Sequence, residues 1–126
     1  PVIDGMRNRN FGRIVNISSD AGRVGSSGET IYAGAKGAVI AFTKAVAAEV
    51  AGSNISVNVV APGLVHTQEL DALLQKMGEE GRNRFWQLVP AGRLGTPEEY
   101  AATVVHLAGE HYLVGQVISP NGGMLI

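Results

Sequence analysis

Tyr32 and Lys36 stand four residues apart and are the pair in this sequence best suited to chemistry. Side chains at that spacing are neighbours on one face of a helix. A free tyrosine titrates at about pH 10 and is a weak base at neutral pH, but a nearby ammonium group favours its ionised form. If Ser19 hydrogen-bonds a substrate oxygen, the three groups could interconvert an alcohol and a carbonyl, with hydride moving to or from a cofactor. Taken alone, the Tyr-x-x-x-Lys spacing also arises by chance.

Three short runs of β-branched and apolar residues predict the strands that must position these groups. They cover residues 12–19, 55–61 and 116–119, and the first ends at Ser19. In an open parallel sheet, ligands bind beyond the carboxyl ends of the strands. We therefore expect the site around Ser19 and around the segment 62–67, which begins with Pro-Gly directly after the second run.

Helical periodicity fills the intervals between these strands. Residues 20–28 predict a Gly/Ser-rich loop, and residues 68–89 predict two short helices on a long excursion. A capping box at 96–99 predicts a further helix that ends near Gly109. Between the first two strands, a helix over 29–51 has the core-facing stripe Ile31, Ala35, Val39, Phe42, Val46 and Val50. The alternation predicts an α/β fold, a parallel sheet covered on both faces, of which three strands are one part.

A second stripe of the 29–51 helix contains only small residues: Gly34, Gly37, Ala41, Ala45 and Ala48. Glycine inside a helix costs about 1 kcal/mol relative to alanine, so a close neighbour is expected along this face. That neighbour is either the sheet of the same subunit or a helix of a second subunit.

Composition excludes several function classes. Of the 126 residues, 45% are hydrophobic and 17% charged, and the net charge of -1 argues against a nucleic-acid surface. The absence of cysteine excludes disulfides, thiolate zinc sites and cysteine nucleophiles, and the three histidines lack the spacing of a metal site. No apolar run approaches a membrane span of about 20 residues and no signal peptide opens the chain, so we expect a cytoplasmic protein with no membrane partner.

Five ordered motifs together resemble the classical short-chain dehydrogenase/reductase family across nearly the whole chain. Ser19 precedes Tyr32 by thirteen residues, the interval which that family uses for its serine and tyrosine. The motifs are NISS at 16–19, YAGAK at 32–36, NVVAPG at 58–63, RLGTPEE at 93–99 and NGG at 121–123. The resemblance implies a Rossmann-like sheet with helices on both faces. Within the family, the chain resembles the members that reduce 3-oxoacyl-acyl-carrier-protein.

The resemblance also implies roles for individual residues. Tyr32 would be the acid/base, Lys36 would stabilise it and bind the nicotinamide ribose, and Ser19 would position the substrate oxygen. The nicotinamide pocket would be lined by Pro62, Gly63, Val65 and Thr67. The excursion over about 68–90 would be the substrate-binding lid, and the 29–51 helix would assemble a homo-oligomer, either a dimer or a tetramer.

Two parts of the family pattern are missing. The glycine-rich phosphate loop is not found, and neither is the residue that selects NAD over NADP, so the cofactor is expected to be NAD or NADP. We expect residues 1–126 to be the C-terminal catalytic half of a single Rossmann-like domain. The expected function is an NAD(P)-dependent alcohol–carbonyl oxidoreductase acting on a small molecule, with 3-oxoacyl thioesters as one candidate substrate. The alternative is a catalytically silent half that keeps the fold and its assembly surface.

Overall fold

The computed structural model describes residues 1–125 and contains a sheet of three parallel strands in the order β1-β2-β3. These are β1 (Gly12–Ile17), β2 (Ile55–Val60) and β3 (Val117–Ile118). The β1–β2 register runs from the pair Gly12–Ile55 to the pair Ile17–Val60. The three predicted strands are therefore confirmed, although each is shorter than its predicted segment: β1 ends at Ile17 and not at Ser19, β2 ends at Val60, and β3 has two residues.

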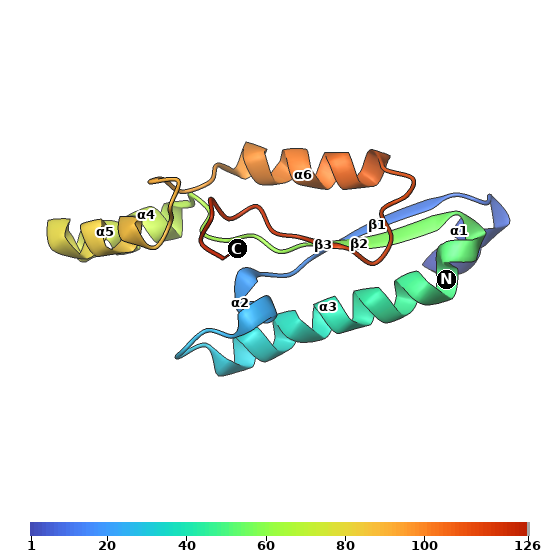
Figure 1. Ribbon diagram of the computed structural model, residues 1–126, viewed down its shortest axis with the longest axis horizontal. Helices are drawn as coiled ribbons and strands as arrows, with labels where there is room; N and C mark the ends of the chain where they lie inside the picture. Colours follow the sequence, from blue (N-terminus) through green and yellow to red (C-terminus); the bar gives the residue numbers. More distant parts are fainter. Residues whose placement is uncertain (126) are drawn as a thin grey trace.

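Helices cover the sheet on both faces, as the sequence predicts. Figure 1 shows α3 below the sheet together with α2, and α6 above it. Helices α4 and α5 extend beyond the end of the sheet where the strands finish. The bounds are α1 (Val2–Asn8), α2 (Asp20–Val24), α3 (Thr30–Val50), α4 (Gln68–Lys76), α5 (Gly78–Gln87) and α6 (Pro97–Gly109), with a short 3₁₀ turn at Ala51–Ser53.

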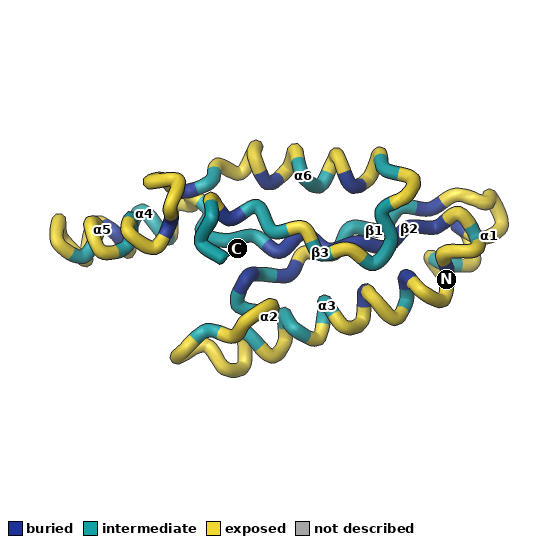
Figure 2. The backbone as a smooth tube through the Cα atoms, in the orientation of Figure 1, coloured by how far each residue is buried: buried dark blue, intermediate teal, exposed yellow. Residues whose placement is uncertain are grey.

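Strand β2 is the centre of the molecule, and all six of its residues are buried. It is hydrogen-bonded on both edges and covered on both faces, which explains its nearly continuous β-branched sequence. Figure 2 shows the buried residues concentrated along this strand, whereas α4 and α5 are mostly exposed. One cluster of the core joins β2 to α3 and α1, and consists of Met6, Ala47, Val50, Ile55 and Val57.

The two connections between neighbouring strands have opposite hands. The strand order advances in one direction from β1 to β3, yet α3 crosses on one face of the sheet and α6 on the other (Figure 1). Since parallel crossovers are right-handed in about 98% of cases, one of these two departs from the rule. No feature of the sequence pattern predicts this departure.

The prediction of a loop over residues 20–28 is partly wrong, because Asp20–Val24 form the helix α2. The Ser19 hydroxyl accepts a hydrogen bond from the Ala21 N–H at 3.2 Å and caps this helix. Arg23 also donates to the Asp20 carboxylate one turn back, at 2.8 Å. These two local polar contacts offset the low helix propensity of a glycine-containing segment.

The predicted inward stripe of α3 is wrong at three of its six members, because Ile31, Ala35 and Phe42 are exposed. Ile31 is 89% exposed and Phe42 is 64% exposed, whereas Thr43, Ala47 and Val50 are buried. Thr43 faces the sheet because its hydroxyl accepts a hydrogen bond from the Asn16 amide at 2.8 Å. A prediction based on apolar residues alone omits this buried threonine. The predicted inward face therefore lies about one residue away from the face that is buried in the structure.

The expectation that no segment could span a membrane is also corrected. By length and composition alone, the segment Thr30–Ser53 is long and apolar enough to cross one. A core helix of a soluble protein can pass the same test. In the structure, α3 packs against β2 through its buried residues, although most of its surface is open.

Asn58 should be a major determinant of stability, because it is fully buried in β2 and joins the strand to the segment before β3. Its amide donates to the Leu113 carbonyl at 2.8 Å and its side-chain oxygen accepts from the Gln116 N–H at 2.9 Å. Asn58→Ala leaves both partners unpaired, so we expect the free energy of unfolding to fall by about 2 kcal/mol in urea titrations of the protein containing this chain. The control Asn83→Ala, on the exposed face of α5, should change it by less than about 0.5 kcal/mol.

Candidate active site

Helix α2 lies against α3 at the level of Lys36, which brings the segment after Ser19 close to the Tyr-x-x-x-Lys helix. A Cβ on Gly22 would stand 2.7 Å from the Lys36 carbonyl carbon, so only glycine allows this approach. The Ser18 hydroxyl donates to the Lys36 carbonyl oxygen at 2.8 Å. The end of β1 is therefore fixed to the first turns of α3 by both packing and hydrogen bonding.

Lys36 lies between the end of β1 and Tyr32. Its ammonium Nζ donates to the Ile17 carbonyl oxygen at 3.3 Å and stands 5.7 Å from the centre of the Tyr32 ring. The phenol itself is 46% exposed. The structure therefore brings Tyr32 and Lys36 together, and the Lys36 ammonium contacts Ile17, the last residue of β1.

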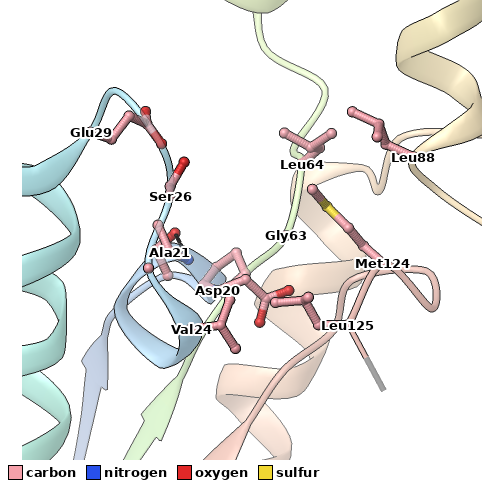
Figure 3. Close-up of a pocket in the computed structure, with 13 residues that line it drawn as sticks. Asp20, Ala21, Val24, Ser26, Glu29, Gly63, Leu64, Leu88, Met124 and Leu125 are labelled. Atoms are coloured by element: carbon pink, nitrogen blue, oxygen red, sulfur yellow. Dashed lines mark hydrogen bonds between the residues drawn. The ribbon is translucent and has the colours of Figure 1, made fainter.

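A cavity of about 310 Å³ opens beyond the carboxyl ends of β1 and β2. Ser19, Pro62 and Gly63 line it, whereas Tyr32, Lys36, Val65 and Thr67 are not among its lining residues. Figure 3 shows Ser26 and Glu29 on one side of the cavity, with Leu64, Leu88 and Met124 on the other. This location agrees with the rule that open parallel sheets bind ligands beyond their strand ends.

The segment from Pro62 to Thr67 follows β2 and is fixed at both ends. A Cβ on Gly63 would stand 2.7 Å from the Cβ of Asn121, so glycine permits the closing turn to lie directly against this segment. At the other end, the Thr67 hydroxyl accepts from the Leu70 N–H at 3.2 Å and caps α4. Val65 forms an isolated parallel bridge with Gly95.

Helix α6 supports the same segment through Tyr100. The Tyr100 hydroxyl donates to the Leu64 carbonyl oxygen at 2.9 Å, and the Gly95 N–H donates to the same oxygen at 3.2 Å. Burial raises the pKa of Tyr100, so the phenol stays protonated and keeps its role as a donor. The loop that follows β2 is thus held by the opposite layer of the molecule.

Sequence reasoning missed several lining residues. Asp20 follows Ser19 directly, and this position at a strand end is the signal that could have identified it. Met124 and Leu125 reach the cavity through the fold of the closing turn, which no local pattern predicts. Within residues 1–125, no group of three or more His, Asp or Glu side chains could hold a metal ion.

The start of α6 should make stability depend on acid pH through Glu99. Hydrogen bonds from Arg93 and from the Thr96 N–H lower the pKa of this carboxyl to about 2. Because the folded pKa lies below the unfolded one, the stabilisation is complete above about pH 4.3 and is lost as the pH falls towards 2. Exposure to solvent screens the pair and keeps the effect small.

We therefore expect Glu99→Gln to lower the melting temperature at neutral pH, with the difference from the native protein shrinking from about pH 6 to about pH 3. Glu98→Gln, one residue earlier and exposed, is the matched control. A Glu99→Gln deficit that stayed constant over this range would contradict the assignment.

Comparisons with known proteins agree with this geometry. A family model described as enoyl-(acyl carrier protein) reductase matches residues 2–125. The acetoacetyl-CoA reductase of Shinella zoogloeoides is 45% identical over 125 residues, covering 98% of this chain and 51% of the relative. The 3-oxoacyl-(acyl-carrier-protein) reductase FabG of Vibrio harveyi is 44% identical over 98% of this chain and 50% of its own length. The chain spans about half the length of the curated relatives it matches.

Solved structures give the same result. The structure of ElxO with NADP bound superposes with a TM-score of 0.88 at 33% identity, covering 97% of this chain and 50% of that one. YwfH, an NADPH-dependent reductase involved in bacilysin biosynthesis, gives 0.87 at 29% identity over 95% of this chain and 49% of its own. The predicted Rossmann-like fold class is confirmed by this likeness. Together with the family model, these matches confirm the resemblance seen in the sequence, and the chain belongs to the short-chain dehydrogenase/reductase family.

Proposed function

We propose that the protein containing this chain is an NAD(P)-dependent oxidoreductase that interconverts an alcohol and a carbonyl by hydride transfer. One observation carries the proposal: α2, which Ser19 caps, lies directly against α3 at Lys36, and Lys36 stands beside the Tyr32 ring. The same strand end opens into the cavity of about 310 Å³. Family membership and the printed names of the relatives support the same reaction class.

Ser19 is proposed to orient the substrate oxygen. Its hydroxyl accepts the Ala21 N–H, which uses one lone pair and leaves the hydroxyl proton free for donation. Ser19 also lines the cavity. It can therefore donate to a carbonyl oxygen there without giving up its role as a helix cap.

Tyr32 is proposed to move the proton. Its phenol gives a proton to the carbonyl oxygen as the alcohol forms, and takes it back in the reverse direction. The Lys36 ammonium lies 5.7 Å from the ring centre, beside the phenol that would exchange the proton. The Ile17 carbonyl holds this ammonium in place at 3.3 Å.

The residues present fit the nicotinamide end of a dinucleotide cofactor. Lys36 would bind the ribose hydroxyls, and Pro62, Gly63, Val65 and Thr67 would hold the ring, on a segment whose backbone is fixed by Asn121, Tyr100 and the cap of α4. When bound, the nicotinamide supplies or takes up the hydride. NADP is favoured over NAD because it is bound in the ElxO structure and NADPH is named for YwfH.

The proposed substrate class is a 3-oxoacyl thioester or its 3-hydroxy counterpart. The two curated relatives are named for acetoacetyl-CoA and for 3-oxoacyl groups on acyl carrier protein. In this chain, Leu64, Leu88 and Met124 supply an apolar side to the cavity that suits a short acyl chain. Helices α4 and α5 would form the lid over it.

Tyr32→Phe should abolish hydride transfer. The change removes only the hydroxyl and keeps the ring, so we expect the rate with a 3-oxoacyl thioester and NADPH to fall at least about a hundredfold. Nicotinamide absorbance follows the reaction. Tyr112→Phe, at a residue that is 97% exposed, is the matched control and should retain full activity. Normal turnover by Tyr32→Phe would refute the assignment.

We also propose that α3 assembles a homo-oligomer, either a dimer or a tetramer. Two large apolar side chains of this helix, Ile31 and Phe42, are exposed. The small residues Gly34, Ala41 and Ala45 are exposed as well, and small side chains allow a second helix to approach closely. Of the two glycines in the predicted stripe, Gly37 lies next to the Gly22 carbonyl, whereas a Cβ on Gly34 would meet nothing within 4 Å.

Ala41→Trp places a large side chain in this exposed face and should dissociate the oligomer. Light scattering should then report a lower mass than for the native protein at the same concentration. Ala102→Trp makes the same change at an exposed position of α6 and should leave the mass unchanged. An unchanged mass for Ala41→Trp would show that α3 is not the interface.

A further inference from the structure

A buried carboxylate lies directly beside the proposed serine and has no part in the reaction described above. Asp20 is 5% exposed and lines the cavity. Its Oδ1 accepts hydrogen bonds from Arg23 and from the Ser119 hydroxyl, and its Oδ2 accepts from the Asn121 amide at 2.7 Å. A buried charge is retained only where its partners compensate for the loss of water. Two of these three donors come from the closing segment that follows β3.

We propose that Asp20 is a positioning residue, which holds the closing segment 119–125 against the strand end that carries Ser19 and thereby fixes the shape of the cavity between them. Figure 3 shows the Asp20 carboxylate below the cavity and directed towards Leu125. Met124 and Leu125 supply one wall of this cavity, and Ser19 and Ala21 belong to the other. The carboxylate is therefore the side chain that joins the two walls.

The backbone of Asp20 takes part in the same connection. Its N–H donates to the Pro62 carbonyl oxygen at 3.0 Å, which ties the start of α2 to the segment after β2. Asp20 is also the first residue of the helix that Ser19 caps. A displacement of Asp20 would consequently move Ser19 relative to Pro62 and to the closing segment together.

The three side chains that donate to Asp20 require a hydrogen-bond acceptor at this position. The orientation of the Asn121 amide is fixed, because its oxygen accepts from the Gly123 N–H at 3.0 Å while its nitrogen also donates to the Leu125 carbonyl at 2.9 Å. An amide in place of the Asp20 carboxylate would direct an NH₂ group at the Asn121 NH₂ group. Neither side chain could turn over without losing other hydrogen bonds, so Asp20→Asn should release the closing segment.

Hydrogen exchange tests this connection without any activity measurement. In Asp20→Asn we expect the Gly123 and Met124 amides, both bonded to Asn121, to exchange at least about tenfold faster than in the native protein. Asp4→Asn, at an exposed carboxylate in α1, is the matched control and should leave both amides unchanged. Unchanged exchange in Asp20→Asn would overturn the proposal. If that variant fails to fold, Ser119→Ala removes one donor to Asp20, a hydroxyl that also contacts the Ala61 carbonyl and the Asn121 amide, and the same two amides should still exchange several-fold faster.

The double change Asp20→Asn with Asn121→Asp exchanges donor and acceptor between the two positions. The new carboxylate can accept from both the amide opposite and the Gly123 N–H, although it no longer donates to the Leu125 carbonyl. Exchange at Gly123 should therefore return part of the way to the native rate. A general loss of stability would not be repaired by this exchange of roles. Failure of the double variant to recover protection would therefore overturn the specific pairing.

The effect on the reaction rests on the proposed function and is measured separately. With a 3-oxoacyl thioester and NADPH, we expect Asp20→Asn to lower kcat/KM about tenfold or more and the double variant to recover most of it. Native turnover by Asp20→Asn, together with faster exchange, would overturn its positioning of the site. If the native protein transfers no hydride to any carbonyl tested, the proposed function fails, and the exchange measurements still decide whether Asp20 holds the closing segment.

Discussion

The contact between α2 and α3 is the constraint on which the rest of the site depends. Gly22 meets the backbone of Lys36 at a distance that excludes any side chain, and the Ser18 hydroxyl bonds the Lys36 carbonyl at the same level. This contact sets where α3 begins relative to the end of β1. Tyr32 lies one turn before Lys36 on the same helix, and the Lys36 ammonium, which bonds the carbonyl at the end of β1, stands 5.7 Å from its ring centre. The chemistry proposed for Ser19 and Tyr32 is therefore a consequence of how two helices pack.

Polar groups buried in this small core carry the connections between elements. Thr43 joins α3 to β1 through Asn16, Asn58 joins β2 to the segment before β3, and Tyr100 joins α6 to the loop after β2. Apolar packing rewards burial but tolerates small shifts between layers, whereas a hydrogen bond between buried groups is lost when its partners slide apart. Each of these bonds thus fixes the position of one element relative to another.

Much of the fold follows from the sequence, because strands and helices differ in their periodicity. The three strands, the helices α4 and α5 and the start of α6 could be predicted, the last from the capping box of Thr96 and Glu99. Two kinds of feature could not. Thr43 is polar yet buried, so a prediction from apolar residues chose the wrong face of α3 and placed the exposed Phe42 inward. Ser19 lines the same cavity as Met124 and Leu125, which lie about a hundred residues later in the sequence. Tertiary structure brings them together, and local spacing does not encode it.

Asp20 shows how a site can depend on a residue that no motif includes. The motif residues around it make short-range contacts, since Ser19 caps its own helix and Thr67 caps α4. The carboxylate instead links residues about a hundred positions apart, from the end of β1 to the turn after β3. In a parallel sheet these segments meet at one edge, but neighbouring strand ends do not hold the loops above them. A buried acceptor shared by donors from two loops does so, and its loss would loosen the cavity while leaving the sheet intact.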